Sequence, residues 1–245
     1  MLLVVSLALA TAGSAFESVA LASGLNAVAI PLSGKVQAPA SGAYTGVFRQ
    51  PAPFASAALD QYQVVAGKTP SVVMWYQPWA SQGMNDFDKA ACVSLYERGI
   101  VPLITWEPWD PGGDPNWLAN PGHQPAYSLA KIIDGSYDSY IRQWARDIKS
   151  LGGPVMLRPM HEMNGNWYPW GAAVNGNTSA QYVSAWRHIH NIFAAESATN
   201  VTWVWSINWW TPVPSTYAEF YPGHAYVDWT AISGLNFGTT RPTSY

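Results

Sequence analysis

Short runs rich in β-branched and aromatic residues alternate along the chain with segments whose apolar residues recur every three or four positions. The runs occupy 45–50, 71–79, 101–109, 154–162, 201–210 and 228–238. Helical spacing is clearest at 140–151, where Gly152 follows as a natural end, and at 182–193. A third amphipathic pattern at 86–99 makes the single cysteine, Cys92, a small core residue.

Strands that alternate with helices predict parallel βαβ units with buried strands. An open doubly wound sheet and a closed (β/α)8 barrel share this element order. No glycine-rich phosphate loop follows a strand, which disfavours a nucleotide-binding open sheet. Pro-Trp pairs stand at or just beyond several strand ends, at 77–79, 107–109 and 168–170, and a barrel gathers such ends around one mouth. The sequence therefore favours the α/β class with a (β/α)8 TIM barrel.

The first residues have a pattern of their own. Residues 1–15, MLLVVSLALATAGSA, are an apolar run followed by small residues, as in a secretory signal peptide, although the usual basic start is missing. The run is too short to span a bilayer, and a buried N-terminal strand or helix is the alternative. Residues 16–42 are expected to form a low-complexity leader or linker, and 43–245 the barrel. A signal peptide predicts a secreted, extracellular protein.

The composition favours a neutral partner. Charged residues make up 11%, against roughly 25% in an average domain, and the net charge of -3 argues against a nucleic-acid-binding surface. The chain has 14 Trp and 13 Tyr but 7 Phe, and rings with a polar group suit surfaces that are partly wet. A hydroxyl-rich sugar fits this balance. We expect no metal, nucleotide or redox cofactor, and the sequence does not specify an oligomeric state.

The candidate chemistry is concentrated at 158–171, RPMHEMNGNWYPWG. Alternation along a strand places on one face Met156, Arg158, Met160 and Glu162. A buried guanidinium needs an acidic partner, because an unpaired buried charge costs several kcal/mol, and that partner is Glu162 or a carboxylate from another strand. Glycosidic bonds are commonly cleaved by two carboxyl groups, while rings and amides hold the sugar. The ring and amide candidates of this segment are Trp167, Trp170 and Asn164.

Several candidates have structural alternatives. A zinc-binding H-E-x-x-H helix would need a second histidine at 165, where the chain has glycine. His188 and His190 lie two apart in a helix and are expected to be structural. The structural alternative for Glu162 is a role limited to pairing with Arg158, without any part in catalysis. The substrate-binding candidates at other strand ends are Trp79, Trp106, Glu107, Trp109 and Trp209, of which Glu107 also suits a structural role.

The segment LRPMHEMNGNWYPWG at 157–171 closely resembles the acid/base segment of glycoside hydrolase family 26. ITWEPW at 104–109 and YPGHAYVDWTAISGLNFG at 221–238 extend the resemblance, which covers 44–240. It implies a (β/α)8 barrel that retains anomeric configuration, chiefly in endo-β-1,4-mannanases and also in β-glucanases and xylanases.

The resemblance also implies roles for individual residues. Glu162 corresponds to the acid/base after strand four, while the nucleophile is a glutamate after strand seven. His161 takes the place of a sugar-contacting residue, and Trp167 that of the aromatic floor of the cleavage site. Together with Arg158 beneath them, Glu162 and His161 form the catalytic set that we predict.

Two departures from the family pattern matter. Leu235 stands where a tyrosine that steadies the nucleophile is expected. After Glu162 the acidic residues are Glu196, Glu219 and Asp228, and the expected elements place none of them as a nucleophile. We therefore expect a barrel truncated after its sixth strand, with unpaired strand edges. On this interpretation the 245-residue chain alone folds poorly and has no glycosidase activity.

The leading hypothesis is a secreted, retaining, endo-acting hydrolase of β-1,4-mannan. One alternative is the same mechanism on β-glucan or xylan, since the sequence does not reveal which group recognises the axial 2-OH of mannose. The other alternative is a non-catalytic sugar-binding barrel, which the missing tyrosine and nucleophile would suit.

Overall fold

The structure, a computed structural model, describes residues 2–4, 33–50, 53–81, 85–112 and 122–235. Its strands are β1 (Leu2–Val4), β2 (Gly46–Val47), β3 (Val72–Pro78), β4 (Val101–Glu107), β5 (Val155–Pro159), β6 (Val201–Asn208) and β7 (Trp229–Ser233). Its α-helices are α1 (Ser56–Ala66), α2 (Lys89–Tyr96), α3 (Leu129–Ile133), α4 (Asp138–Leu151) and α5 (Ser179–Ala195). Short 3₁₀ helices are η1 (Pro125–Tyr127), η2 (Tyr217–Phe220) and η3 (His224–Tyr226).

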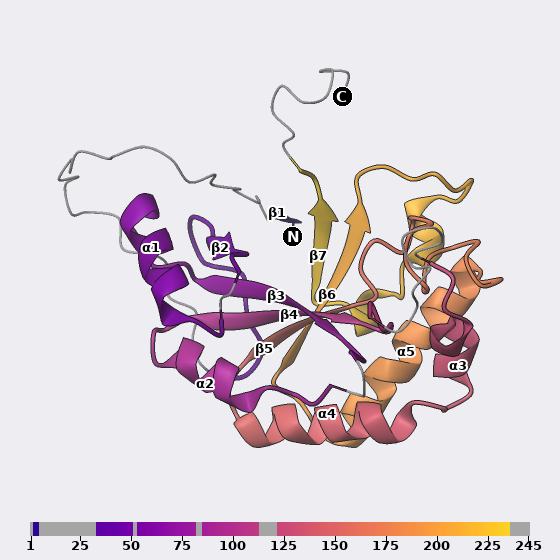
Figure 1. The fold of residues 1–245 in the computed structure, drawn as a ribbon, viewed down its shortest axis with the longest axis horizontal. Coiled ribbons are helices and arrows are strands. Elements are labelled where there is room, and N and C mark those ends of the chain that lie inside the picture. The colour runs from indigo at the N-terminus through magenta and orange to yellow at the C-terminus, as the bar shows by residue number, and fades with distance from the viewer. Residues whose placement is uncertain (1, 5–32, 51–52, 82–84, 113–121, 236–245) are drawn as a thin grey trace.

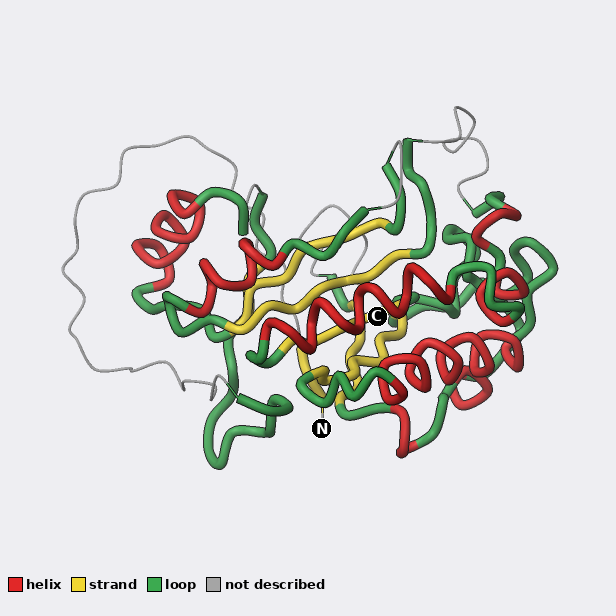
Figure 2. The backbone as a smooth tube through the Cα atoms, turned by 90° about the horizontal axis from the view of Figure 1, so that it is seen from below, coloured by secondary structure: helices red, strands yellow, loops and turns green. Residues whose placement is uncertain are grey.

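The strands form one parallel sheet in the order β1-β7-β6-β5-β4-β3-β2. From β2 to β7, neighbours in the sheet are neighbours in the sequence, and the large helices α4 and α5 lie along the same side of the sheet (Figures 1 and 2). A doubly wound sheet would reverse its strand order and carry helices on both faces. The described strands instead form a curled half-barrel, which confirms the barrel prediction and its six strands.

One strand lies outside the predicted six. β1 comes from the segment 1–15 and pairs with β7, with Leu2 opposite Thr230 and Val4 opposite Ile232. The signal peptide stays a prediction, and 5–15 lies outside the described residues. None of the helices in the described part of the chain combines the length and the hydropathy needed to cross a lipid bilayer.

The strands bury apolar side chains on both faces, as parallel strands covered by helices do. The outer face carries large rings that pack on the helices: Trp106 lies 4.7 Å from Trp144 of α4, and Trp203 lies 5.1 Å from Phe193 of α5 between ring centroids. The inner face carries a second apolar cluster, which includes Met74, Leu103, Met156, Val204 and Trp229. The outer face therefore anchors the helices, and the inner face fills the half-barrel.

Part of the segment predicted as a leader, 16–42, is packed against the beginnings of the last strands. The backbone N–H of Val36 donates to Thr202 Oγ1 at 2.8 Å, and Trp229 Nε1 donates to the carbonyl of Val36 at 3.1 Å. Lys35 forms an ion pair of 2.9 Å with Asp228. These contacts cover the inner apolar cluster at the end of the half-barrel opposite the strand C-termini.

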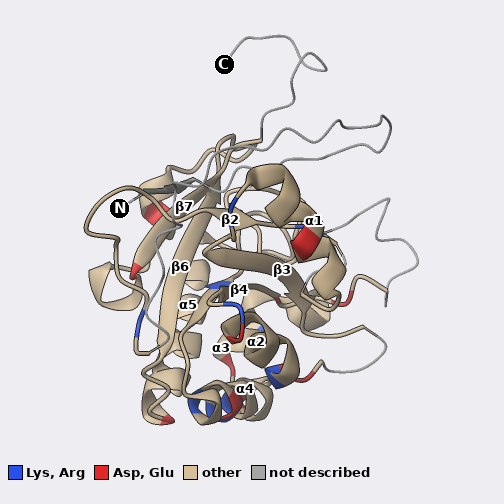
Figure 3. Cartoon of the chain, turned by 90° about the vertical axis from the view of Figure 1, so that its left-hand side faces the viewer, with Lys and Arg blue, Asp and Glu red and all other residues tan. Residues whose placement is uncertain are grey.

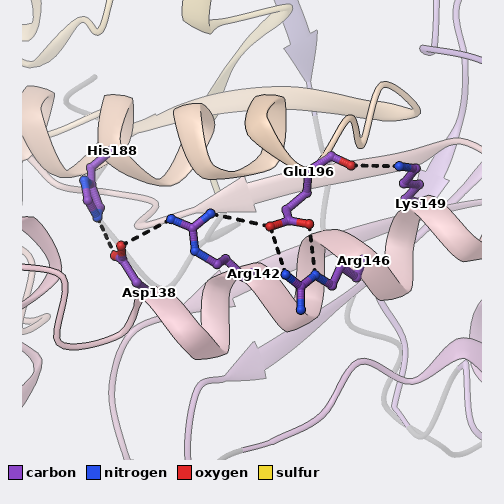
Figure 4. A network of polar contacts seen from close by, with 6 residues as sticks. All are labelled: Asp138, Arg142, Arg146, Lys149, His188 and Glu196. Carbon is purple, nitrogen blue, oxygen red and sulfur yellow. Dashed lines mark hydrogen bonds and ion pairs between the residues drawn. The ribbon is translucent and has the colours of Figure 1, made fainter.

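A network of charged side chains joins α4 to α5 (Figure 4). Glu196, which caps α5, accepts hydrogen bonds from Arg142 and Arg146, and these cations lower the pKa of its carboxyl group. At the other end of the network, His188 Nε2 lies 2.6 Å from Asp138 Oδ1. Basic and acidic residues are accordingly gathered along α4 (Figure 3). His188 therefore has a structural contact, as the sequence predicted.

Buried Asn200 generates a stability prediction. Its side-chain amide donates to the carbonyl of Ile148 at 2.8 Å and to that of Gly153 at 2.7 Å, which ties the end of α4 to the start of β6. We expect Asn200→Ala to lower the free energy of unfolding by on the order of 2 kcal/mol, because it leaves two carbonyls without their donor. Urea unfolding of the purified protein measures this. Thr199→Ala, at an exposed neighbouring position, is the control, and equal losses in both variants would contradict the prediction.

Candidate active site

The chain leaves β5 through two residues with left-handed backbone geometry. Met160 has φ 48° and Glu162 has φ 54°, conformations that are uncommon for residues with a side chain. Their backbone N–H groups donate to the neighbouring strands, from Met160 to Trp106 at 3.1 Å and from Glu162 to Ser206 at 2.8 Å. The strand alternation that we extended to Glu162 therefore ends at Pro159. The prediction that Met160 shares a face with Arg158 is wrong, because Met160 belongs to the apolar cluster on the helix side.

Glu162 lies at the surface, beyond the C-terminal end of β5. It is partly exposed, and Trp167 Nε1 donates to its Oε2 at 3.1 Å. The indole of Trp167 lies against Gly165, where a Cβ would come within 2.3 Å of the ring. The ring of Trp210 runs parallel to that of Trp167, with an interplanar angle of 7° and centroids 6.2 Å apart. The structure thus brings together the predicted acid and its predicted aromatic neighbour.

Beneath Glu162 lies a layer of buried polar groups. Arg158 donates from Nε and Nη2 to Thr105 Oγ1, at 2.9 and 2.6 Å. Among the described residues, no carboxylate oxygen forms an ion pair with this guanidinium within 4.0 Å. Neither acidic partner that the sequence offered Arg158, Glu162 or a carboxylate from another strand, forms this ion pair among the described residues, and the hydroxyl of Thr105 on the neighbouring strand accepts from the guanidinium.

Glu107 and His161 meet in the same layer. Burial raises the pKa of Glu107 to about 8, and the negative charge of Glu162 adds to this, while the Trp109 indole and Arg158 oppose it. Burial, with the positive charge of Arg158, holds the pKa of His161 well below 6.5. His161 Nδ1 lies 3.8 Å from Glu107 Oε1. At pH 7 the pair is therefore largely neutral, with a protonated carboxyl group and an uncharged imidazole.

Three predicted sugar-binding rings are fully buried. Trp79 and Trp106 pack against each other on the helix side, with centroids 4.9 Å apart. Trp170 donates its indole N–H to the carbonyl of His161 at 2.7 Å. A ring with no exposed face cannot stack on a sugar, so in this structure these rings act as packing residues. The prediction that they bind substrate is corrected accordingly.

Asn164 is also buried, and its amide is fully used. Nδ2 donates to the carbonyls of Asn208 and Trp210, at 2.9 and 3.0 Å, while Oδ1 accepts from the backbone N–H of Asn208 at 2.8 Å. The prediction that Asn164 binds sugar hydroxyls is corrected, because its hydrogen bonds fix the loop after β6. Trp109 and Trp209 are partly exposed, and for both a role in substrate binding stays a prediction.

Two further exposed rings lie near the candidate site: Tyr76 escaped the sequence analysis, whereas Trp210 was judged equally suited to packing and to ligand binding. Tyr76, at the end of β3, is 41% exposed, and its ring centroid lies 5.7 Å from that of His161. Trp210 is 51% exposed. The strand alternation that puts Met74 on the inner face also puts Tyr76 there, so the period of β3 was the signal for it. For Trp210, the sequence offered only its place at the end of a strand.

The later acidic residues have structural partners. Glu219 accepts from Thr216 in a capping box at the start of η2, and Asp228 pairs with Lys35. Glu196 belongs to the network between α4 and α5. Leu235, in the place of the expected tyrosine, is exposed. Within the described residues, no group of three or more His, Cys, Asp or Glu side chains is arranged to hold a metal ion.

Comparison with known proteins yields relatives whose names are those of glycan hydrolases. The chain is 36% identical to Endoglucanase H of Acetivibrio thermocellus over 189 residues, which are 75% of this chain and 19% of that protein. It is 24% identical to a mannan endo-1,4-beta-mannosidase of Bacillus subtilis over 225 residues, 80% of this chain and 57% of the relative. The chain thus spans between about a fifth and three fifths of these relatives.

Among solved structures, Bacillus subtilis mannanase BCman has a similar fold. The TM-score is 0.56 at 20% identity, and the match covers 84% of this chain and 63% of that one. Such neighbours are (β/α)8 barrels, of which the described strands form a part. Residues 123–236 match the model of Glycosyl hydrolase family 26. The resemblance read from the sequence is confirmed over the segment 123–236, which carries Glu162 and matches the glycosyl hydrolase family 26 model.

Proposed function

We propose that Glu162 is the acid/base of a retaining, endo-acting glycoside hydrolase that cleaves β-1,4-mannan. One observation carries the proposal: a partly exposed carboxylate stands beyond the C-terminal end of β5, hydrogen-bonded by the Trp167 indole, with a second exposed indole beside it. The C-terminal ends of barrel strands are where enzymes of this fold carry their active sites. The family match supports glycoside hydrolysis in general, and the mannan substrate is the finer part of the proposal.

The proposed mechanism uses Glu162 twice. With one oxygen held by Trp167, the carboxyl group gives its proton to the oxygen of the glycosidic bond as that bond breaks. A second carboxylate attacks the anomeric carbon and forms a covalent glycosyl ester. Glu162 then takes a proton from water while the water oxygen attacks the anomeric carbon. The bond to the second carboxylate breaks, and the sugar is released. The resemblance assigns that nucleophile to a seventh barrel strand, and we assign it to no residue of the described part.

The buried layer beneath Glu162, made of Arg158, Glu107 and His161, enters the proposed mechanism as a set of polar groups with little negative charge. A largely protonated Glu107 and a neutral His161 leave Arg158 as the charged member of the layer. A hydrogen-bond donor on Glu107 and a polar imidazole then lie close to the proposed acid. His161 and Glu107 are both buried, so we propose that this layer supports Glu162 from beneath, and the sugar contacts predicted for these two residues stay predictions.

The proposal that mannan is the substrate rests on the names of the relatives. Mannan endo-1,4-beta-mannosidases match at 24 to 35% identity, and a beta-1,3-xylanase of Vibrio matches at 27% over 107 residues. The 36% match to Endoglucanase H makes β-glucan the second candidate. Because the described residues offer no second carboxylate placed to attack, we propose that the 245-residue chain alone releases no reducing sugar, and that an active protein must also supply that carboxylate. Digests of mannan, lichenan and xylan by such an active protein discriminate between these substrates.

We also propose that residues 1–15 direct secretion. The support is the apolar run followed by small residues, together with a polymeric substrate that is met outside the cell. N-terminal sequencing of the protein recovered from the culture medium of its host tests this proposal.

Replacing the proposed acid tests the mechanism. In the active protein, Glu162→Gln is expected to lower kcat on mannan about 10²- to 10⁴-fold, the usual contribution of general acid–base catalysis. On an aryl glycoside with a good leaving group, added azide is expected to restore turnover and give a glycosyl azide of retained configuration, since azide needs no base. Glu219→Gln, at the capping box of η2, is the matched control. Wild-type rates in the Glu162 variant would rule out the assigned role.

The proton on Glu107 predicts a pH-dependent stability. The folded protein keeps this proton up to pH about 8, whereas an ordinary carboxyl loses it near 4.5, so the folded state binds the extra proton between these values. Glu107 therefore contributes a falling slope to the free energy of unfolding between pH 4.5 and 8, which neutral His161 opposes below pH 6.5. Glu107→Gln is expected to remove the slope that Glu107 contributes and to stabilise the protein at pH 7 by on the order of 3 kcal/mol.

Urea unfolding at pH 5, 6, 7 and 8 measures this slope. Glu97→Gln, at an exposed position on the surface of the barrel, is the control and should keep it. An identical slope in the Glu107 variant would mean that this carboxyl is ionised in the folded protein.

A further inference from the structure

We infer that Trp210 is the ring on which a saccharide unit of the substrate stacks, and that Trp167 instead holds Glu162 in place. This inference rests on the proposed function and deepens it by naming a binding surface. The sequence resemblance gave the stacking role to Trp167. The contacts of the two rings divide the roles differently.

Trp167 has little free surface. A Cβ on Gly165 would lie 2.3, 2.4 and 2.7 Å from three consecutive atoms of its six-membered ring, so the Gly165 backbone lies directly on a face of that ring. The ring of Trp210 lies parallel to that of Trp167, and the indole N–H of Trp167 donates to Glu162. Trp167 is accordingly only partly exposed. These contacts suit a positioning residue for Glu162.

Trp210 has the opposite character. It is 51% exposed and lies beside the partly exposed ring of Trp167, so the two indoles form an exposed aromatic pair next to the proposed acid. It stands parallel to the ring that hydrogen-bonds the proposed acid, so a sugar lying on it is close to the carboxyl group. The apolar C–H face of a pyranose fits an indole face, whereas an anionic ligand would be repelled by Glu162.

The backbone that carries Trp210 is fixed before any ligand arrives. Asn164 Nδ2 donates to the carbonyl of Trp210 at 3.0 Å, and the N–H of Trp210 donates to Asn208 Oδ1 at 3.0 Å. Thr211 Oγ1 donates to the carbonyl of Asn164 at 2.8 Å. Asn164 is fully buried, and its bond to the Trp210 carbonyl is partly shielded from water. Asn164 therefore ties the loop after β6, which carries Trp210, to the segment that carries Glu162.

Binding to an inactivated protein tests the inference without activity as its readout. In the Glu162→Gln protein, calorimetry measures the affinity for mannopentaose, cellopentaose and xylopentaose. Adding Trp210→Ala is expected to weaken the affinity for the bound sugar about tenfold, the usual effect of losing a central aromatic contact. Trp210→Phe, which keeps a stacking face, is expected to restore most of it. Phe54→Ala removes a comparably exposed ring from the segment before α1 and should change nothing.

The outcomes separate this inference from the proposed function. If the Glu162→Gln protein binds a sugar and Trp210→Ala binds it equally well, the role of Trp210 is refuted while the proposed function stands. A loss that Trp210→Phe does not restore also refutes stacking, because it shows that the indole is needed for packing against Trp167. If the folded Glu162→Gln protein binds none of the three sugars, both proposals fail.

Discussion

Two backbone hydrogen bonds hold the segment after β5 between the ends of β4 and β6, and the candidate site depends on these two bonds. Met160 donates to β4 and Glu162 donates to β6, so the segment is held on both sides although it is no longer a strand. Each left-handed residue costs on the order of 1–3 kcal/mol, and such geometry persists only where the surroundings impose it. The adjacent strand ends of a parallel sheet supply those surroundings, which is why a barrel strand can aim a carboxylate at the surface.

The two faces of the sheet divide the work of the aromatic residues. On the outer face, Trp106 and Trp203 pack on α4 and α5 and hold the helices in place. Toward the strand C-termini the inner face changes from Met156 to Arg158, and from Leu103 to Thr105 and Glu107, so it turns polar within one or two steps. The abundance of tryptophan is therefore largely a property of the core, and the rings open to a ligand are few.

The fold was predictable because its signals are periodic. β-Branched runs and three-to-four spacing located the six strands and the helices around 140–151 and 182–193. The Pro-Trp pairs at several strand ends, with no glycine-rich phosphate loop, favoured the barrel. The site was only partly predictable. Glu162 and Trp167 were singled out by their motif, and the structure places them within hydrogen-bond distance. Alternation could not reveal that the strand ends at Pro159. Nor could the sequence tell buried Trp170 from exposed Trp210, because exposure depends on contacts between distant segments.

Amide side chains explain why an apparently sugar-binding motif leaves few groups to bind sugar. Asn164, Asn177 and Asn200 are buried, and each donates both amide hydrogens to backbone carbonyls of other segments. They act as substitutes for strand pairing where the chain is irregular, since buried carbonyls need donors. In the proposed function, recognition is therefore left to the exposed rings and to the acid that they flank. A ring stacks on the shape of a pyranose and does not read its hydroxyl pattern, which is why the proposed stacking by itself does not select one β-glycan.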